Sequence, residues 1–197
     1  AAQGDLGRSG RPPLLAYNFL SGEHLVDVAD GRPMVLRRPD GELGLAGLMR
    51  AHLFSAFASM AYGLRILREA ADVPIDSMYA HGGIFATPVV AQRILAAAFG
   101  TPVSVGTAAT EGGAWGMALL AGYMQAGLAP GEDDGAAAPV SDGAALPGLA
   151  DYLDATVFVD QEVVTIAPDP AEVAEFTRYL EAFDAALPLA RSAAQLF

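Results

Sequence analysis

The sequence predicts an α/β protein in which helices pack on a sheet, and three observations lead to this prediction. Hydrophobic residues make up 53% of the 197 residues, which is enough to build a sizeable core. Helical and strand-like patterns alternate along most of the chain. Gly-Gly turns follow two of the predicted strands and lead into helices.

Short elements come first, before the longest helix. Residues 14–20 form an apolar run that predicts a strand, and residues 21–23 end it. Residues 24–42 contain turns rich in Gly and Pro and predict a loop with short strands. In residues 43–71 apolar side chains recur in steps of three and four, which predicts a helix that stops before Pro74.

A strand, a glycine turn and a second helix come next. Residues 75–80 predict the strand, and residues 81–83, which read His-Gly-Gly, predict a tight turn. Thr87 and Pro88 then predict a helix start, with Thr87 as the N-cap and Pro88 at the first helical position. Gly100 predicts the end of this helix, because glycine readily adopts the left-handed conformation found after helix ends.

A further strand and helix follow, and then a C-terminal group of elements. Residues 102–105 predict the strand, and residues 111–127 predict a helix that opens on Glu-Gly-Gly. Residues 149–153 predict a helical turn and residues 156–160 a short strand. A long amphipathic helix starts at residues 169–170, which read Asp-Pro. Its apolar stripe comprises Val173, Phe176, Leu180, Phe183 and Leu187.

The net charge of −12 is concentrated in one part of the chain, and every basic residue is Arg. Residues 1–130 carry ten acidic residues and nine Arg, whereas residues 131–184 carry thirteen acidic residues and one Arg. Such a charge repels phosphate backbones, so we expect no nucleic-acid partner. The apolar runs are much shorter than the ~20 residues of a membrane helix, so we expect no membrane partner. The absence of cysteine excludes disulfides and Cys-based zinc sites.

Residues 130–148 predict an acidic, flexible loop. This stretch is rich in Gly, Ala and Pro and contains Glu132, Asp133 and Asp134 in sequence. A charge cluster of this kind is usually a solvated surface, and a metal site is the less favoured alternative. We therefore assign no metal ligand to the chain.

The turn at Gly82 and Gly83 fits either a chemical or a purely geometric role. Glycine lets a backbone approach a ligand closely and adopts positive φ at little cost. The helix expected after the turn offers free N–H groups and a partial positive charge to an anion, which suits a chain without lysine. The alternative is a plain connection between strand and helix. Neither the P-loop pattern nor the GxGxxG dinucleotide pattern occurs in the sequence.

The second glycine motif favours a packing role. Gly112 and Gly116 lie one helical turn apart, so their helix can approach a neighbour closely. Trp115 is the only tryptophan, and a position in the core or an interface is favoured over a ligand platform.

The histidines and one glutamate leave alternatives open. His24, His52 and His81 show no catalytic or metal-binding spacing, so surface or core positions are favoured. His81 is the exception among the three histidines, because it adjoins the glycine turn. Glu23 fits contact with a substrate and capping of a loop equally well.

Taken in order, these motifs resemble the C-terminal part of the FGGY carbohydrate kinases. Residues 79–88, with Gln92 and residues 100–103, resemble the adenosine-binding segment of that family. Residues 111–121 are similar to its E-x-x-A-x-G-x-A helix, and residues 16–23 to its P-Y-L-x-G-E strand and loop. The His-Gly-Gly and Glu-Gly-Gly-Ala-Trp-Gly runs are most similar to a xylulokinase/ribulokinase-like subgroup.

The resemblance implies a ribonuclease-H-like fold of the actin–hexokinase superfamily, with a mixed sheet and flanking helices. Such kinases have two domains and hold ATP and sugar in the cleft between them. Residues 1–197 would be the C-terminal, nucleotide-binding domain, incomplete at its N-terminal side. Because no D-x-G-T phosphate loop and no sugar site are found here, we expect the N-terminal kinase domain of the same polypeptide to supply the catalytic residues.

The resemblance also implies a site and a reaction. Gly82 and Gly83 would lie against the ribose and α-phosphate of ATP, and Ile84, Phe85 and Thr87 would flank the adenosine. In the family's reaction a carboxylate base takes a proton from a sugar hydroxyl, which then attacks the γ-phosphate of ATP bound with Mg2+. No catalytic residue and no metal ligand is expected in this chain.

Two hypotheses about function follow. The first is ATP-dependent phosphorylation of a pentulose such as xylulose or ribulose in the cytoplasm, with this chain supplying the adenosine-binding half and being inactive alone. The second is a non-catalytic interaction or regulatory module on the same fold, for which the apolar helix at residues 43–71 is a candidate surface. Family members are often dimers, so a homodimer is a possible assembly.

Gln92 would support its own helix rather than touch the ligand.

Overall fold

The computed structural model describes residues 12–71, 74–87, 89–106, 112–127, 148–156, 158–159 and 162–196. Helices and strands alternate in these ranges, so the chain is a mixed α/β protein as predicted. The acidic loop predicted at residues 130–148 lies outside them except for Gly148, and Pro88 and Glu111 also lie outside. No helix in the described ranges is both long and apolar enough to cross a membrane.

The chain divides into two compact units. Unit 1 comprises Ala1–Met78, Pro88–Val103 and Thr165–Phe197, and unit 2 comprises Tyr79–Thr87 and Ser104–Val164. Unit 1 holds the first two strands and three of the helices. Unit 2 holds the glycine turn and the helix that opens on Gly112.

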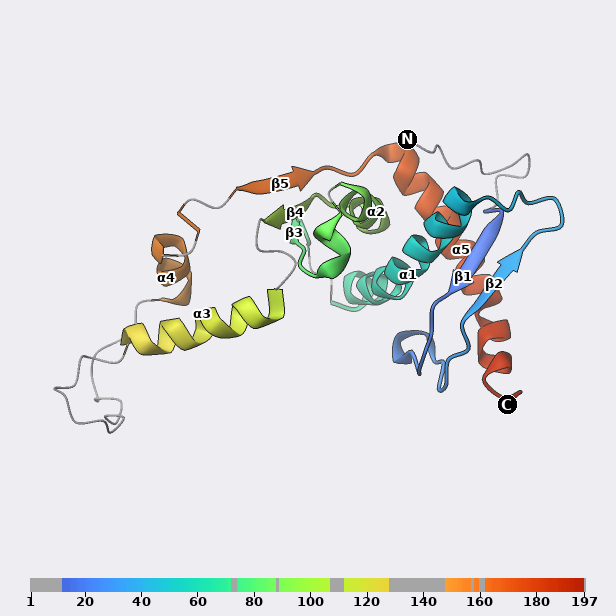
Figure 1. The fold of residues 1–197 in the computed structure, drawn as a ribbon, viewed down its shortest axis with the longest axis horizontal. Helices are drawn as coiled ribbons and strands as arrows, with labels where there is room; N and C mark the ends of the chain where they lie inside the picture. The colour runs from blue at the N-terminus through green and yellow to red at the C-terminus, as the bar shows by residue number, and fades with distance from the viewer. Residues whose placement is uncertain are drawn as a thin grey trace. The chain divides into compact units, whose positions relative to one another are not determined.

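In unit 1 a strand pair is flanked by long helices (Figure 1). β1 (Leu14–Tyr17) pairs antiparallel with β2 (Met34–Arg37), with Leu14 opposite Arg37 and Tyr17 opposite Met34. The short 3-10 helix η1 (His24–Val26) lies between them in sequence. The helices are α1 (Leu45–Ala71), α2 (Val90–Phe99) and α5 (Pro170–Ala193). The predicted helix over 43–71 is therefore confirmed, with its start at Leu45.

Helix α5 begins where the sequence predicts. The Asp169 side chain accepts hydrogen bonds from the backbone N–H groups of Ala171 and Glu172, at 2.8 and 3.2 Å. These bonds satisfy two of the donors that a helix start leaves without partners, and Pro170 fits the first turn because it has no N–H to satisfy.

Aromatic rings from β1 and α5 form the centre of the core of unit 1. Tyr17, Tyr179 and Phe183 are each at most 2% exposed. The rings of Tyr17 and Phe183 stack with centroids 4.5 Å apart, and the Tyr17 hydroxyl donates to the Phe183 carbonyl at 2.6 Å. Tyr179, rather than the predicted Leu180, lies on the buried face of α5, and Leu180 is only partly buried.

A hydroxyl explains why a tyrosine occupies that buried position. The Tyr179 hydroxyl accepts from the backbone N–H of Ala16 at 3.2 Å and lies 3.1 Å from the carbonyl oxygen of Ala51, to which it can donate. A buried polar group is costly unless it is hydrogen-bonded, and here the partners come from β1 and α1. Tyr179 thereby joins three elements that are far apart in sequence.

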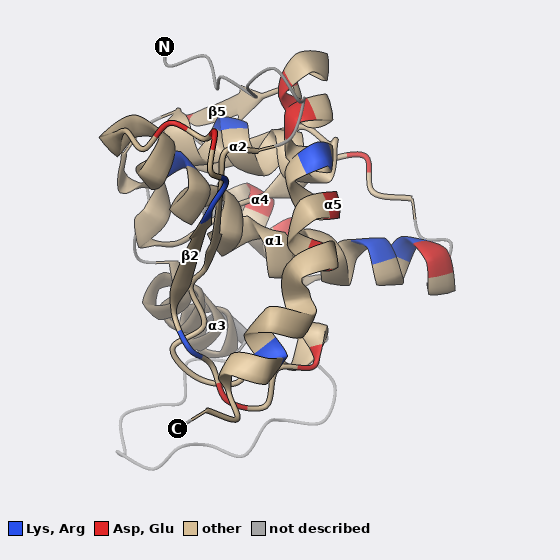
Figure 2. Cartoon of the chain, turned by 90° about the vertical axis from the view of Figure 1, so that its right-hand side faces the viewer, with Lys and Arg blue, Asp and Glu red and all other residues tan. Residues whose placement is uncertain are grey.

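Three of the four acidic residues of α5 pair with Arg residues from earlier in the chain. Arg50 of α1 donates to both carboxylate oxygens of Glu175, at 2.9 and 2.6 Å. Arg93 of α2 pairs with Glu172 at 2.5 Å, and Arg65 of α1 with Asp184 at 3.0 Å. Figure 2 shows these opposite charges distributed over α1, α2 and α5. The uneven charge of the sequence is thus partly neutralised within unit 1.

Burial raises the pKa of both core tyrosines above their ordinary value of 10.0, with Tyr179 and Asp184 adding to the effect on Tyr17. A raised folded-state pKa means that folding favours the neutral phenol. The stability that this preference contributes is present below pH 10.0 and is lost as the pH rises above it.

We therefore expect the urea midpoint of unfolding to fall as the pH rises from about 8 to about 11, because the unfolded phenols ionise first. Tyr179→Phe removes one of these groups and should flatten the fall, at a cost of about 1–3 kcal/mol at neutral pH from the unpaired Ala16 N–H. Tyr62→Phe, at a partly exposed residue, is the matched control. An equal fall in the wild type and the Tyr179 variant would contradict this account.

Three short strands form a second sheet in the order β3 (Met78–Tyr79), β4 (Val103–Gly106), β5 (Val163–Ile166). The N–H of Met78 donates to Pro102 O, and the N–H of Ala80 donates to Ser104 O. From the first of these bonds to the second, the donor and the acceptor both move two residues forward in sequence, which indicates that β3 and β4 are parallel. Parallel strands need a crossover connection, and here that connection contains α2. The division between the units falls within these strands.

Three predicted strands differ from the structure. The strand predicted over residues 14–20 ends at Tyr17. The strand predicted over residues 75–80 is limited to Met78–Tyr79. The strand predicted over residues 156–160 is wrong for its described residues: α4 (Leu149–Thr156) extends to Thr156, and residues 158–159 form a bend and a turn. The strand lies instead at β5, whose sequence Val-Val-Thr-Ile is β-branched throughout and so suits extended backbone.

The start of α2 also differs from the prediction. Thr87 is not an N-cap; it ends the short 3-10 helix η2 (Gly83–Ala86) in an extended conformation, as expected for a residue before proline. Val89 follows with a φ of 73° and makes no side-chain capping bond, so the helix begins at Val90. Its end is as predicted, because Gly100 adopts the left-handed conformation and its N–H bonds to Ala96 O.

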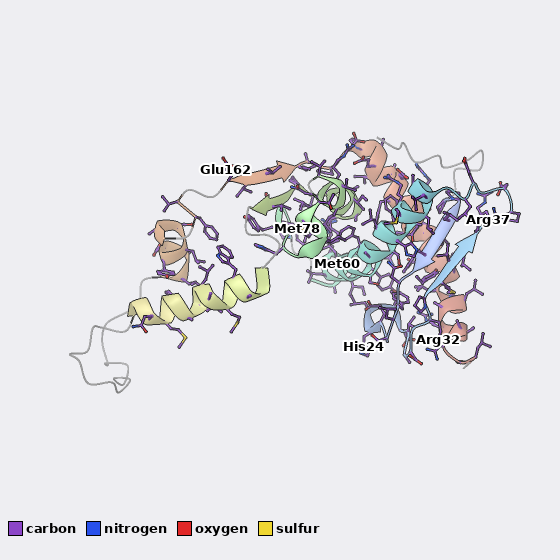
Figure 3. All side chains as sticks on the ribbon, viewed as in Figure 1. His24, Arg32, Arg37, Met60, Met78 and Glu162 are labelled. Carbon is purple, nitrogen blue, oxygen red and sulfur yellow. The ribbon has the colours of Figure 1, made fainter. Side chains whose placement is uncertain are left out.

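Unit 2 joins η2 to a pair of helices. Helix α3 (Gly112–Gly127) and helix α4 bring Tyr123 and Tyr152 together, with ring centroids 5.3 Å apart. Side chains of the two helices meet between them (Figure 3). A Cβ at Gly122 would lie 3.1 Å from the Tyr152 hydroxyl, so this glycine lets the helices approach closely. The predicted helices over residues 111–127 and 149–153 are confirmed within the described residues.

Candidate nucleotide-binding turn

The glycine turn follows directly on the end of β3. Gly82 has φ 128° and ψ 159°, a combination that only glycine adopts without strain. The N–H of Phe85 then donates to Gly82 O at 3.0 Å, and this bond closes the first turn of η2. The turn is therefore a backbone feature that no other residue at position 82 would form easily.

The space beside both glycines is open. Among the described residues, and apart from its neighbours in the chain, a Cβ added at Gly82 or at Gly83 would meet no atom within 4 Å. The N–H groups of Gly83 and Ile84 lie at the start of η2, where a helical backbone offers them no acceptor. The described residues therefore leave room for a ligand on the Cβ side of both glycines.

All the residues that the family resemblance assigned to the adenosine site lie on this one segment of unit 2. Gly82 and Phe85 are partly buried, whereas Gly83, Ile84 and Thr87 are exposed. Ile84, with 38% of its surface exposed, is an apolar side chain available to a flat, apolar ligand surface. The sequence did not predict η2, which lies between the turn and α2, so the helical N–H groups next to the turn belong to η2 and not to the expected helix.

His81 connects the two glycine motifs. A Cβ at Gly112, the first residue of α3, would lie 2.5 Å from His81 Cβ, 2.9 Å from Cγ and 3.1 Å from Nδ1. The His81 side chain thus fills the place where Gly112 lacks one. Its ring also lies near Tyr79, with centroids 4.9 Å apart, and near Trp115, at 6.3 Å.

The second glycine motif is confirmed in part. Gly112 permits a close approach as predicted, although the neighbour is a side chain of the turn rather than a helix. For Gly116, a Cβ would meet no atom of another described element within 4 Å, so no packing contact of this glycine is seen in the described ranges. Trp115 is partly buried, and its ring faces Phe158 at 6.3 Å as well as His81.

Three other residues that the sequence analysis considered have hydrogen-bond partners within the protein. Glu23 caps η1, where its side chain accepts from the N–H of Leu25 at 3.4 Å. His52 lies on α1, and its Nδ1 is 2.6 Å from Asn18 Oδ1. Gln92 is 5% exposed and donates from Nε2 to Val103 O at 2.8 Å, so it fastens α2 to β4 as expected.

Charge and metal ligands are sparse in this region. Helix α3 contains no charged residue, and it is drawn without charged segments in Figure 2. Within the described ranges no group of three or more His, Asp or Glu side chains could hold a metal ion. The acidic cluster at residues 132–134 lies outside those ranges.

Comparison with protein families gives a match over most of the chain. The family described as "FGGY family of carbohydrate kinases, C-terminal domain" matches residues 6–125. The chain belongs to the FGGY family of carbohydrate kinases. The matched residues include the glycine turn and most of α3, so the motifs that carry the resemblance lie inside the family match.

A solved structure shows a similar fold. The chain is similar to the crystal structure of xylulose kinase from Rhodospirillum rubrum, with a TM-score of 0.57 and 18% sequence identity. The match covers 95% of this chain and 32% of that kinase, so the chain spans about a third of its length. At this identity the likeness concerns the fold. No curated protein sequence matches the chain.

Sequence reasoning found the residues of the turn but missed what surrounds it. The contact of His81 with Gly112 and the ring series of Tyr79, His81, Trp115 and Phe158 were not predicted. One signal was present, because Tyr79 and His81 are two residues apart and so share a face of extended backbone.

Proposed function

We propose that the polypeptide containing this chain transfers the γ-phosphate of ATP to a sugar hydroxyl, with a pentulose such as xylulose or ribulose as the substrate. In this proposal the chain supplies the adenosine-binding half. Gly82 and Gly83 lie against the ribose and α-phosphate, and Ile84, Phe85 and Thr87 flank the adenosine. The observation that carries the proposal is the open Gly82-Gly83 turn inside a chain of the FGGY family.

The form of the turn supports a nucleotide at this place. Phosphate oxygens are bound well by backbone N–H groups that have no partner in the protein. The sequence has no lysine, so Arg is the only permanently positively charged side chain that the chain can offer to phosphate, and backbone N–H groups become correspondingly more important. The open space beside Gly82 and Gly83 lets a nucleotide reach those N–H groups.

The proposed reaction divides the work between two parts of the polypeptide. A carboxylate base removes the proton of the sugar hydroxyl, the hydroxyl oxygen bonds to the γ-phosphorus, and the bond to the β-phosphate oxygen breaks to release ADP. We expect that base in an N-terminal kinase domain. Mg2+ would neutralise phosphate charge, and because the described ranges hold no suitable cluster, no residue there is proposed as its ligand.

The same proposal extends to architecture and location. We propose that residues 1–197 form the C-terminal, ribonuclease-H-like domain of the kinase, lacking its N-terminal side, and that this domain docks on the N-terminal kinase domain. The family match and the fold of the xylulose kinase support this assignment. We also propose that the enzyme is located in the cytoplasm and forms a homodimer.

The activity is tested by measuring ADP release from the full-length protein with ATP, Mg2+ and a panel of pentuloses, hexuloses and polyols. We expect release that depends on the sugar and is fastest with a pentulose. ADP release that no sugar stimulates would overturn the proposed reaction and favour a non-catalytic module on the same fold.

Gly83→Val separates a nucleotide contact from a purely structural turn. Apart from its chain neighbours, no described residue has an atom within 4 Å of a Cβ at this position, and Gly83 does not have positive φ, so the fold should tolerate the change. If the nucleotide occupies that space, the KM for ATP should rise severalfold, because losing one good contact costs about 1 kcal/mol.

The matched control is Gly44→Val, since Gly44 also has open space around it but lies in unit 1 before α1. It should leave the KM for ATP unchanged. Equal KM values for the wild type and Gly83→Val would mean that no nucleotide lies beside Gly83.

A further inference from the structure

We propose that His81 is a positioning residue for the nucleotide, because its side chain fixes the glycine turn against the first turn of α3. The inference rests on the function proposed above and adds a residue to it. The role comes from the packing of the ring and not from its charge. His81 is not proposed to touch the reacting atoms.

The fit between His81 and Gly112 is close enough to fix a position. A Cβ at Gly112 would be 2.5 Å from His81 Cβ and 2.9 Å from Cγ, far below normal van der Waals contact. The two residues can therefore share this space only while position 112 has no side chain. The start of α3 and the start of the turn are held at one separation by this contact.

Two aromatic rings lie beside the imidazole, although His81 as a residue is exposed. The centroid of the Tyr79 ring is 4.9 Å from that of the His81 ring, and the two ring planes are inclined by 38°. The centroid of the Trp115 ring is 6.3 Å from that of the His81 ring, and these planes are inclined by 35°. Since Trp115 is one turn along α3 from Gly112, the same helix contacts His81 at two levels.

The glycines need such support from outside. Neither Gly82 nor Gly83 has a side chain, and outside their chain neighbours no described residue has an atom within 4 Å of a Cβ placed on either. Glycine is also the most flexible residue of a chain, so the turn gains rigidity from the residues beside it. His81, directly before Gly82, supplies a side-chain contact that ties the turn to α3.

The consequence for catalysis is a loss of alignment when the ring is removed. A misplacement of about 1 Å at a binding group can slow a reaction about a hundredfold. The nucleotide is proposed to bind the turn, whereas the sugar is proposed to bind elsewhere. Removal of the ring should therefore weaken the use of ATP and leave the use of sugar unchanged.

The first test compares His81→Ala with His81→Phe in the full-length protein. We expect His81→Ala to raise the KM for ATP about fivefold to tenfold, with the KM for sugar unchanged. His81→Phe retains a flat ring over Gly112 and should restore most of the ATP affinity. His24→Ala, at an exposed histidine of unit 1, is the control and should change neither constant.

The second test is a double-variant cycle between positions 81 and 112. Gly112→Ala should raise the KM for ATP, because the new Cβ displaces the His81 side chain. In a His81→Gly background the three atoms that this Cβ would meet at 2.5–3.1 Å are removed, so Gly112→Ala should add no further increase. Coupling of this kind is expected only for residues in direct contact. Additive effects on KM would overturn the inference.

The outcomes distinguish this inference from the proposed function. If the wild-type protein shows no sugar-dependent use of ATP, the proposed function itself fails. If the wild type is active and His81→Ala has the same KM for ATP, the positioning role is wrong. A His81→Ala variant that loses ATP and sugar affinity equally, or a His81→Phe variant no better than His81→Ala, would also overturn it.

Discussion

Phe183→Ala is expected to lower the free energy of unfolding by about 3–5 kcal/mol, the usual cost of truncating a fully buried phenylalanine. The Phe183 ring is 0% exposed. It stacks on the Tyr17 ring with centroids 4.5 Å apart, and its centroid lies 6.2 Å from the ring centroids of both Phe19 and Tyr179. Truncation leaves a cavity at the point where β1 and α5 meet, and the surrounding rings cannot fill it without leaving their own contacts.

Urea unfolding followed by circular dichroism measures this effect. Leu189→Ala is the matched control, because Leu189 lies on the same helix with 55% of its surface exposed, and it should cost less than about 1 kcal/mol. A loss at Phe183 as small as the loss at Leu189 would show that α5 does not pack on β1 in the way described.

Gly82→Ala is expected to raise the KM for ATP at least about tenfold and to leave the KM for sugar unchanged. With φ 128° and ψ 159°, position 82 lies in a region that costs any other residue about 1–3 kcal/mol. The chain can avoid this strain only by changing the shape of the turn. Any such change moves the N–H groups that are proposed to face the phosphate.

Gly100→Ala provides a control matched for strain. Gly100 also has positive φ, at 59°, and open space around it, but it ends α2 in unit 1. Its replacement should lower stability by about 1 kcal/mol without raising the KM for ATP. If both variants raise that KM equally, general destabilisation is the cause, and the turn has no special relation to the nucleotide.

Local sequence patterns predicted most of the helices, for physical reasons that are visible in the structure. The apolar steps over residues 43–71 correspond to α1, and the Asp169 cap starts α5 as expected. Both signals depend on residues that are near one another in sequence. Gly82 and Gly83 were recognised as candidate ligand contacts by the same kind of signal, because a strand, a glycine pair and a helix follow in order.

Features that depend on distant residues were not predicted. Tyr179 was left out of the apolar stripe of α5, because its hydroxyl is tolerated in the core only through partners on β1 and α1. The pairing of Glu175 with Arg50 joins residues 125 positions apart. The short strand β3 and the contact of His81 with Gly112 likewise depend on neighbours that no local pattern reveals.

The central claim is that adenosine lies against the segment from Gly82 to Thr87, and photolabelling with an azido-adenine analogue of ATP tests it most directly. Because the chain contains no lysine, trypsin cuts it only after Arg, and the whole segment falls in one peptide, residues 69–93. We predict that the label is found in this peptide and that excess ATP prevents the labelling. Labelling confined to other peptides of the protein, and prevented by ATP there, would contradict the account.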